Sequence, residues 1–221
     1  MKLPLKIAAL LFPPKCVLCR RILKENETDL CHSCRCDTTE FKSRNVSLPH
    51  LAQWIALWYY EENVRRSILR FKFHGARSYA ESYGRLLAMK ILSEDMDFDI
   101  LTWVPISSLR KWRRGYDQVE LLARAVGNEL DVAPVQCLKK HRHNKPQSGL
   151  GNAAQRRANV LGVYRCIQPE LVRGKRVLLL DDVMTTGATA GECARILLTA
   201  GAKAVLCATV AAASHQRKNS R

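Results

Sequence analysis

The sequence predicts an α/β protein in which helices cover both faces of a mostly parallel sheet, with a small cysteine-rich unit before it. The strand candidates are continuous apolar runs rather than alternating ones, as in sheets buried on both faces. Segments with helical apolar spacing separate these runs. Five of the nine cysteines crowd between residues 16 and 36, which marks the separate unit. A chain of 221 residues accommodates one α/β domain and this appendage.

The expected strands and helices alternate along the chain. We expect strands at residues 54–60, 100–104, 135–138, 175–180 and 204–210. We expect helices at residues 63–73, 79–92 and 188–200, and one long helix that Ser107 or Ser108 caps and that ends near Leu130. The polar stretch 139–155 is either a functional lid or a segment without fixed structure. We therefore divide the chain into an N-terminal unit and linker (1–49), a main domain (50–213) and a basic tail (214–221).

The charge balance is strongly basic. The chain has 36 Lys and Arg against 20 Asp and Glu, a formal net charge of +16. Such a field attracts nucleic acid, phosphorylated metabolites or acidic lipid, although excess basic charge can also serve solubility alone. The apolar run at residues 7–12 is too short for a membrane span and lacks a signal-peptide cleavage site. We predict a cytoplasmic protein that is not an integral membrane protein.

Two adjacent carboxylates follow a buried strand. Val177–Leu180 is apolar and places Asp181 and Asp182 at the carboxyl end of the strand, where ligands bind in open α/β sheets. Burying two carboxylates is costly unless something pairs with them. The vicinal hydroxyls of a ribose would donate hydrogen bonds to them, and a Mg²⁺ ion could share the site.

The next residues predict a phosphate-binding loop. Gly187 permits close approach of the backbone, and the backbone N–H groups of a helix that begins near Ala188 favour an anion. Hydroxyl donors come from Thr185, Thr186 and Thr189. The alternative is a glycine-containing turn before an ordinary helix start. The combination of the acid pair and this loop favours a phosphorylated ribose as the ligand.

A cluster of arginines follows the strand that Pro105 ends. Arg110, Arg113 and Arg114 have the spacing that places side chains on one face of a helix. Concentrated positive charge at the carboxyl end of a strand suits a pyrophosphate group. The alternative interpretation is a solvated basic helix face.

Four cysteines have the spacing of a zinc site. Cys16 and Cys19 form one CxxC pair and Cys31 and Cys34 another, with eleven residues between the pairs. Four thiolates would complete a tetrahedron around a structural zinc ion, and Cys36 or His32 could replace one of them. The alternatives are a redox pair or cysteines without a common role.

A basic run predicts contact with nucleic acid. Lys139, Lys140, Arg142 and Lys145 could follow a phosphate backbone. Aromatic residues are available for base stacking: Trp54, Trp58, Tyr59 and Trp112. In the alternative, the run is a lid that serves the small-molecule site, and the strand aromatics belong to the core.

Further motifs are spread along nearly the whole chain: Leu69-Arg70-Phe71-Lys72-Phe73-His74-Gly75, Arg110-Lys111-Trp112-Arg113-Arg114-Gly115-Tyr116-Asp117-Gln118, Gln147-x2-Leu150 and Arg156-x2-Asn159. Together with the two CxxC pairs and residues 181–189, they resemble the ComF (competence protein F) family. That family usually has Asn where this chain has Asp117, and the gap from Leu150 to Arg156 is one residue longer than usual.

The resemblance implies a type I phosphoribosyltransferase-like parallel sheet flanked by helices, with an N-terminal zinc ribbon or knuckle. It implies that residues 181–189 bind phosphoribosyl pyrophosphate and that the loop with Pro105, Ile106 and Ser107 binds its pyrophosphate. Family members are implicated in natural transformation and the use of extracellular DNA.

Three hypotheses for the function follow. The first is a Mg²⁺-dependent phosphoribosyltransferase or a hydrolase of phosphoribosyl compounds. The second is a non-catalytic protein that binds single-stranded DNA and keeps the phosphoribosyl site as a sensor. The third is an adaptor that docks on DNA-uptake proteins. Thr185 stands where some purine-salvage relatives of the fold have an Asp base, which argues against that particular reaction.

Overall fold

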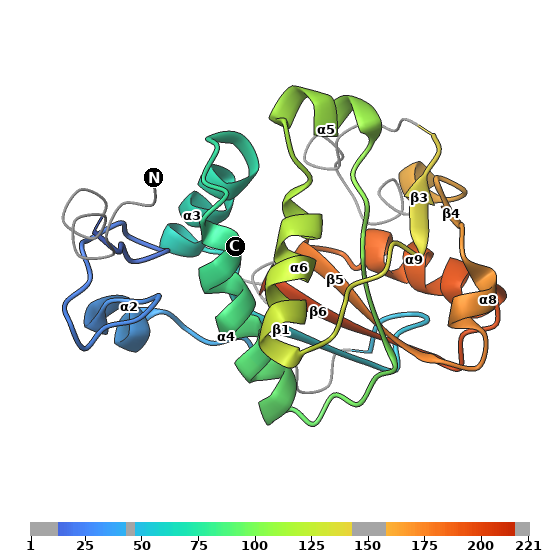
Figure 1. Cartoon of the computed structure of the whole chain (residues 1–221), viewed down its shortest axis with the longest axis horizontal. Helices are drawn as coiled ribbons and strands as arrows, with labels where there is room; N and C mark the ends of the chain where they lie inside the picture. The colour runs from blue at the N-terminus through green and yellow to red at the C-terminus, as the bar shows by residue number, and fades with distance from the viewer. Residues whose placement is uncertain (1–12, 43–46, 143–157, 215–221) are drawn as a thin grey trace, which may run out of the picture.

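The computed structural model describes residues 13–42, 47–142 and 158–214. Four strands form a parallel sheet with the order β1-β6-β5-β2 (Figure 1). Their bounds are Gln53–Tyr59 (β1), Ile100–Trp103 (β2), Arg176–Met184 (β5) and Ala204–Ala212 (β6). The principal helices are α3 (Glu62–Phe73), α4 (Tyr79–Ser93), α6 (Gln118–Leu130) and α9 (Ala188–Thr199). The predicted fold class is confirmed.

Helices cover both faces of the sheet because successive side chains of a strand point to opposite faces. Leu178 and Leu180 belong to the core that contains the apolar faces of α3, α4 and α6. Val177 and Leu179 belong to the second core, under α9. All four side chains are fully buried. Burying each stabilises the fold by about 1.5–3 kcal/mol relative to leaving it exposed, so the continuous apolar run of β5 holds the two cores on one sheet.

The prediction of one long helix from Ser107 or Ser108 to Leu130 is wrong, because two helices occupy this region. The first, α5 (Ser108–Arg114), ends at Gly115, whose backbone is left-handed with φ 73°. Asp117 then caps α6, since its side chain accepts hydrogen bonds from the backbone of Val119 and Glu120. A glycine that ends one helix, followed two residues later by a strong N-cap, breaks the helical run.

A small antiparallel pair lies beside the main sheet. β3 (Leu138–Lys140) pairs with β4 (Tyr164–Cys166), and the short helix α8 (Pro169–Val172) follows. The expected strand at 135–138 overlaps β3 only at Leu138, and sequence reasoning missed β4 and α8. Both strands have three residues with a charged residue in the middle, so neither carries an apolar run. Lys139 and Lys140, expected in the polar stretch, are therefore strand residues.

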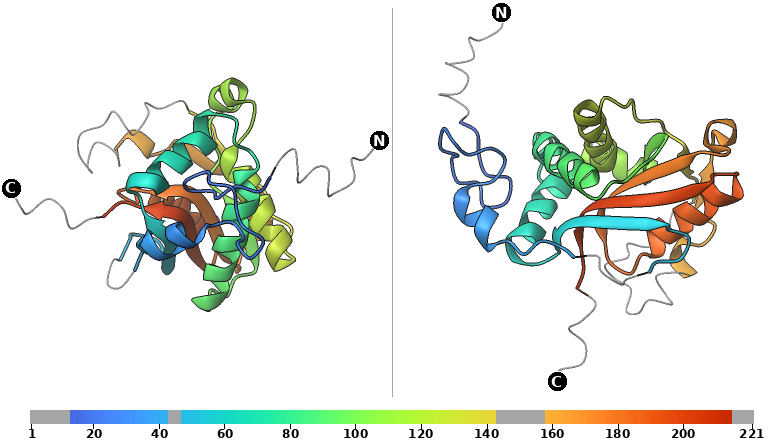
Figure 2. Two further views of the ribbon diagram at one scale, coloured as in Figure 1. Left: turned by 90° about the vertical axis from the view of Figure 1, so that its left-hand side faces the viewer. Right: turned by 90° about the horizontal axis from the view of Figure 1, so that it is seen from below.

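The N-terminal unit packs on α3 and α4 (Figure 2). It contains the helix α2 (His32–Asp37) and the turns that carry the first cysteines. Ser67 of α3 donates a hydrogen bond to the backbone oxygen of Val17. Arg70 of α3 donates one to the backbone oxygen of Leu18 at 2.5 Å. These two contacts, one buried and one partly buried, attach the unit to α3.

In the described part of the chain, no helix is both long and apolar enough to span a bilayer.

Candidate functional site

A cavity of about 850 Å³ opens at the carboxyl ends of β5 and β2. After β2 the next helix that joins the core is α6, which packs on one face of the sheet. After β5 comes α9, which packs on the other face. Neighbouring parallel strands whose connections leave to opposite faces create a crevice, and ligands of open α/β sheets bind in such crevices. The topology therefore favours a binding site here.

The structure brings together most of the residues that the sequence predicted for a phosphoribosyl ligand. The following predicted residues line the cavity: Pro105, Ile106, Arg110, Arg113, Arg114, Asp181, Asp182, Thr185, Gly187, Ala188 and Thr189. Ser107 and Thr186 are not among its lining. The Ser107 hydroxyl caps α5 by accepting a hydrogen bond from the Arg110 backbone, and the Thr186 hydroxyl accepts one from the backbone of Ala188. These two side chains shape the loops that carry their neighbours.

Asp182 is already paired on both carboxylate oxygens. Lys72 Nζ of α3 lies 2.7 Å from Oδ1, and Gln118 Nε2 of α6 donates to Oδ2 at 2.8 Å. Arg114 in turn donates to the Gln118 side-chain oxygen at 2.7 Å. Partners of opposite charge and hydrogen-bond donors lower the cost of burying a carboxylate. Asp182 is thus fixed in place before any ligand arrives.

Asp181 is in a different state. Its Oδ1 accepts a hydrogen bond from the Asp182 backbone at 2.8 Å, and it forms no ion pair within the described residues. Burial, and then the neighbouring Asp182 charge, raise the pKa of Asp181 to about 8. A carboxylate whose charge is this costly favours a cation or several hydrogen-bond donors beside it. The donors of a ribose diol or a Mg²⁺ ion fit this requirement.

Gly187 shapes the loop between β5 and α9. It has φ 73°, and a Cβ atom there would lie 2.8 Å from Leu48 Cδ2. The left-handed backbone therefore disfavours larger residues, and the Leu48 side chain would have to shift to make room for one. The loop ends at the N-terminus of α9, whose first backbone N–H groups lack partners within the helix. The geometry suits an anion held by backbone donors.

We expect Gly187→Ala to lower the stability of the protein and to weaken the binding of phosphate groups by this loop. The left-handed backbone alone costs about 1–2 kcal/mol for a residue with a Cβ, and Leu48 must also move. Gly174→Ala is the matched control, since Gly174 has φ +72° but nothing within 4 Å of an added Cβ. Thermal unfolding of both variants should show the larger loss for Gly187→Ala. Equal melting temperatures and unchanged ligand affinity would contradict the assignment.

The arginines come from α5, in which no residue is buried. Arg110, Arg113 and Arg114 all line the cavity, so the expected common face is present. The Arg114 guanidinium carbon lies 4.6 Å from the centre of the Phe73 ring of α3, a cation–π contact. The helix thus carries three guanidiniums beside the loop with Pro105 and Ile106.

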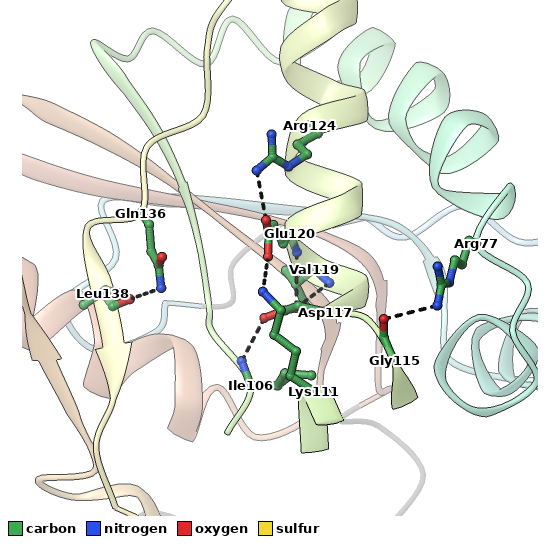
Figure 3. A network of polar contacts seen from close by, with 10 residues as sticks. All are labelled: Arg77, Ile106, Lys111, Gly115, Asp117, Val119, Glu120, Arg124, Gln136 and Leu138. Carbon is green, nitrogen blue, oxygen red and sulfur yellow. Dashed lines mark hydrogen bonds and ion pairs between the residues drawn. The ribbon is translucent and has the colours of Figure 1, made fainter. Parts of the chain in front are cut away.

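Asp117 positions that loop (Figure 3). Its carboxylate accepts hydrogen bonds from the backbone N–H of Ile106 at 3.2 Å, Val119 at 3.0 Å and Glu120 at 3.2 Å. Three backbone donors on one carboxylate tie the loop after β2 to the start of α6. Asp117 is not among the lining residues of the cavity. The acid therefore serves the shape of the site rather than direct contact.

Sequence reasoning did not assign roles to Lys72, Gln118, Arg65 or Tyr60. The first two hold Asp182, and the last two line the cavity. A signal existed for Lys72 and Gln118, because both belong to the motifs of the ComF resemblance. Their contacts join segments far apart in the chain, which no local pattern reveals.

The described residues of the basic run do not all face the same way. Lys140 lines the cavity, where burial and then Arg110 lower its pKa to about 8, while its Nζ lies 5.4 Å from the centre of the Tyr164 ring. Lys139 is the next residue of β3 and points to the opposite side, exposed like Arg142. Lys145 lies outside the described residues. Nucleic-acid contact through these residues stays a prediction.

The aromatic candidates for base stacking differ in how far they are buried. Trp54 and Trp58 are 5% exposed and belong to the two cores, as the alternative interpretation expected. Tyr59 packs edge-on against Phe41. Trp112 of α5 is 80% exposed, the largest exposure among the large apolar side chains described.

The four cysteines of the predicted zinc site converge. The sulfur atoms of Cys16, Cys19, Cys31 and Cys34 lie within 4.8 Å of one another. Cys36 and His32 are outside this group, and Cys36 Sγ lies 3.7 Å from His32 Nε2. Four thiolates this close together are the donor set of a structural zinc site, so these residues would hold the ion. The predicted zinc-binding unit is confirmed.

Comparisons with known proteins agree with this arrangement. The model of the phosphoribosyl transferase domain matches residues 116–221, and that of the double zinc ribbon domain matches residues 7–45. Competence protein F of Haemophilus influenzae is 26% identical over 215 residues, which cover 86% of this chain and 93% of the relative. DNA utilization protein YhgH of Escherichia coli (strain K12) is 29% identical over 209 residues, covering 88% and 90%. Competence protein ComFC of Streptococcus pneumoniae is 28% identical over 188 residues, covering 85% and 77%.

Proposed function

We propose that this chain, which is similar over most of its length to competence protein F and DNA utilization protein YhgH, binds phosphoribosyl pyrophosphate together with Mg²⁺ in DNA uptake or the use of extracellular DNA. One observation carries the molecular part of the proposal. A single cavity gathers the acid pair, the loop before α9 and the arginines of α5. The biological process rests on the names of the relatives.

Each part of the ligand has a matching group in the cavity. The backbone N–H groups of the loop at Gly187 hold the 5′-phosphate, helped by the hydroxyls of Thr185 and Thr189. Asp181 and Asp182 accept hydrogen bonds from the ribose hydroxyls. The arginines of α5 and the backbone at Ile106 hold the pyrophosphate.

Magnesium fits beside Asp181, the carboxylate that has a raised pKa and no ion pair among the described residues. When bound, the ion neutralises negative charge on the pyrophosphate oxygens. The protein's own groups orient the ligand: Lys72 and Gln118 keep Asp182 fixed, and Asp117 keeps the loop at Ile106 fixed.

In a transfer reaction, an acceptor atom would form a bond to C1 of the ribose while the bond from C1 to the pyrophosphate oxygen breaks. The electron pair leaves with pyrophosphate, where the arginines stabilise the charge, and the proton of the acceptor passes to solvent. Thr185 cannot act as a base at neutral pH, so the purine-salvage type of transfer is not proposed. Binding is the activity that the cavity supports best.

Isothermal titration of the whole protein tests the proposal. We expect one phosphoribosyl pyrophosphate per chain in the presence of Mg²⁺, and at least tenfold weaker binding after the ion is removed with a chelator. Ribose 5-phosphate should bind more weakly than phosphoribosyl pyrophosphate, because it leaves the arginines unused. No binding in the presence of Mg²⁺ would refute the proposal. A parallel assay for released pyrophosphate separates transfer or hydrolysis from binding alone.

A further inference from the structure

One wall of the cavity supplies none of the groups assigned to direct contact with the phosphoribosyl ligand. Four residues of α3 line it: Arg65, Leu69, Lys72 and Phe73. Their spacing of four, three and one residues places them on one stripe of the helix. The opposite stripe is buried and consists of Val64, Ser67, Ile68 and Phe71. Helix α3 therefore has one face in the core and one face in the cavity, and we call the second face the α3 wall.

The position of the α3 wall follows from one contact. Lys72 reaches Asp182 at 2.7 Å, so the C-terminal part of α3 lies at the acid pair. With a rise of about 1.5 Å per residue, Arg65 lies roughly 10 Å further along the helix. Tyr60, just after β1 and five residues before Arg65 in the chain, also lines the cavity. Tyr60 and Arg65 come from elements that contribute neither the phosphate loop nor the α5 arginines.

The chemistry of the α3 wall is apolar and cationic. Leu69, Phe73 and the nearby Tyr60 give the cavity apolar and aromatic lining, and Arg65 forms no side-chain hydrogen bond or ion pair within the described residues. No carboxylate or amide side chain belongs to the wall. Stacking and charge, rather than hydrogen bonds to the edge of a base, would hold a ligand here.

We propose that the α3 wall is a subsite for a second ligand, a planar aromatic anion, which would be the acceptor of a transfer reaction. The inference rests on the proposed function, because it assigns the second ligand of the same site. A cavity of about 850 Å³ lies in the upper part of the usual range for ligand sites, which leaves room for two small molecules. The negative charge can belong to a ring carboxylate or to the phosphate of a nucleotide.

Titrations of the protein saturated with Mg²⁺ and phosphoribosyl pyrophosphate test the proposal. The probes are orotate, a ring carboxylate, and thymidine 5′-monophosphate, which distinguish the two sources of charge. Uracil is the neutral planar control, and cyclohexanecarboxylate is the anionic control without an aromatic ring. We expect at least one of the first two to bind at least tenfold more tightly than both controls.

Two neighbouring arginines give matched variants. Arg65→Ala should weaken binding of the preferred probe at least tenfold and leave the affinity for phosphoribosyl pyrophosphate unchanged. Arg66→Ala removes an exposed guanidinium that is outside the cavity lining and, among the described residues, bonds only Asn63, so it should change neither affinity. Both side chains are exposed, and neither variant is expected to affect folding.

The outcomes separate this inference from the proposed function. If phosphoribosyl pyrophosphate binds but neither probe exceeds its controls, the α3 wall is not a subsite and the proposed function stands. Equal effects of Arg65→Ala and Arg66→Ala would also overturn the subsite. If a probe binds through Arg65 while phosphoribosyl pyrophosphate does not bind at all, the proposed function fails and the wall remains a binding site for planar anions.

Discussion

Replacing Asp181 and Asp182 together by Asn is expected to weaken Mg²⁺-dependent binding of phosphoribosyl pyrophosphate at least about 100-fold. A hydrogen bond to a charged group contributes about 1.5–3 kcal/mol, and each factor of ten in affinity corresponds to about 1.4 kcal/mol. Losing one such bond at each carboxylate therefore gives roughly two to four factors of ten. The amides also remove the negative charge that attracts the metal ion.

Titration calorimetry of the double variant and of each single variant measures this effect. Asp97→Asn is the control, because Asp97 is 80% exposed and pairs with Arg176 at the opposite end of β5. It should bind phosphoribosyl pyrophosphate as the unchanged protein does. If the double variant binds within threefold of the unchanged protein, the acid pair is not the ribose site.

The single variants should differ in stability. Asp182→Asn leaves Lys72 without its carboxylate and should be destabilising. Asp181→Asn replaces a carboxyl group that is mostly protonated at neutral pH, because its pKa is about 8, and should not destabilise the protein there. Because the pKa of Asp181 is raised from 3.8 to about 8, the folded protein holds this proton more tightly than the unfolded chain. The corresponding stability is present below about pH 4 and is lost as the pH rises to about 8, and Asp181→Asn should remove this dependence.

The sequence was sufficient to predict those parts of the site that are contiguous in the chain. The acid pair lies in the last part of β5, past the apolar run that predicted the strand, and Gly187 and the start of α9 follow shortly after it, so one segment determines their geometry. The partners of Asp182 could not be predicted in this way. Gln118 lies 64 residues away, and only the packing of α6 and α3 against the sheet brings Gln118 and Lys72 to one carboxylate.

Short elements with charged residues limited the prediction of the fold. β3 and β4 are stabilised by their pairing with each other, and neither has the apolar run that identifies a buried strand. That pairing also separates two lysines of the basic run, because Lys140 then lines the cavity and Lys139 points to the opposite side of the strand. In α5 and α6 the apolar pattern continued across Gly115, and only the left-handed backbone of that residue ended the first helix.

Cys34→Ser is expected to release zinc, unfold the N-terminal unit and weaken phosphoribosyl pyrophosphate binding severalfold. Binding of structural zinc contributes about 10–16 kcal/mol to the folding of small zinc units, more than the few buried contacts of this unit can replace. Unfolding of the N-terminal unit would affect the cavity through α3. Ser67 and Arg70 bond the unit at Val17 and Leu18, and Lys72 on the same helix holds Asp182.

Cys36→Ser is the matched control, because Cys36 belongs to the same unit but lies outside the group of four sulfur atoms. Zinc content by atomic emission should be one ion per chain in this control and fall in Cys34→Ser, together with the melting temperature. A Cys34→Ser protein that keeps its zinc and its stability would contradict the assignment of the four ligands. If it loses zinc but binds phosphoribosyl pyrophosphate unchanged, then α3 is held by its contacts with the sheet alone. A severalfold loss of affinity would instead mean that the zinc unit supports the position of Lys72, and with it the fixed orientation of Asp182.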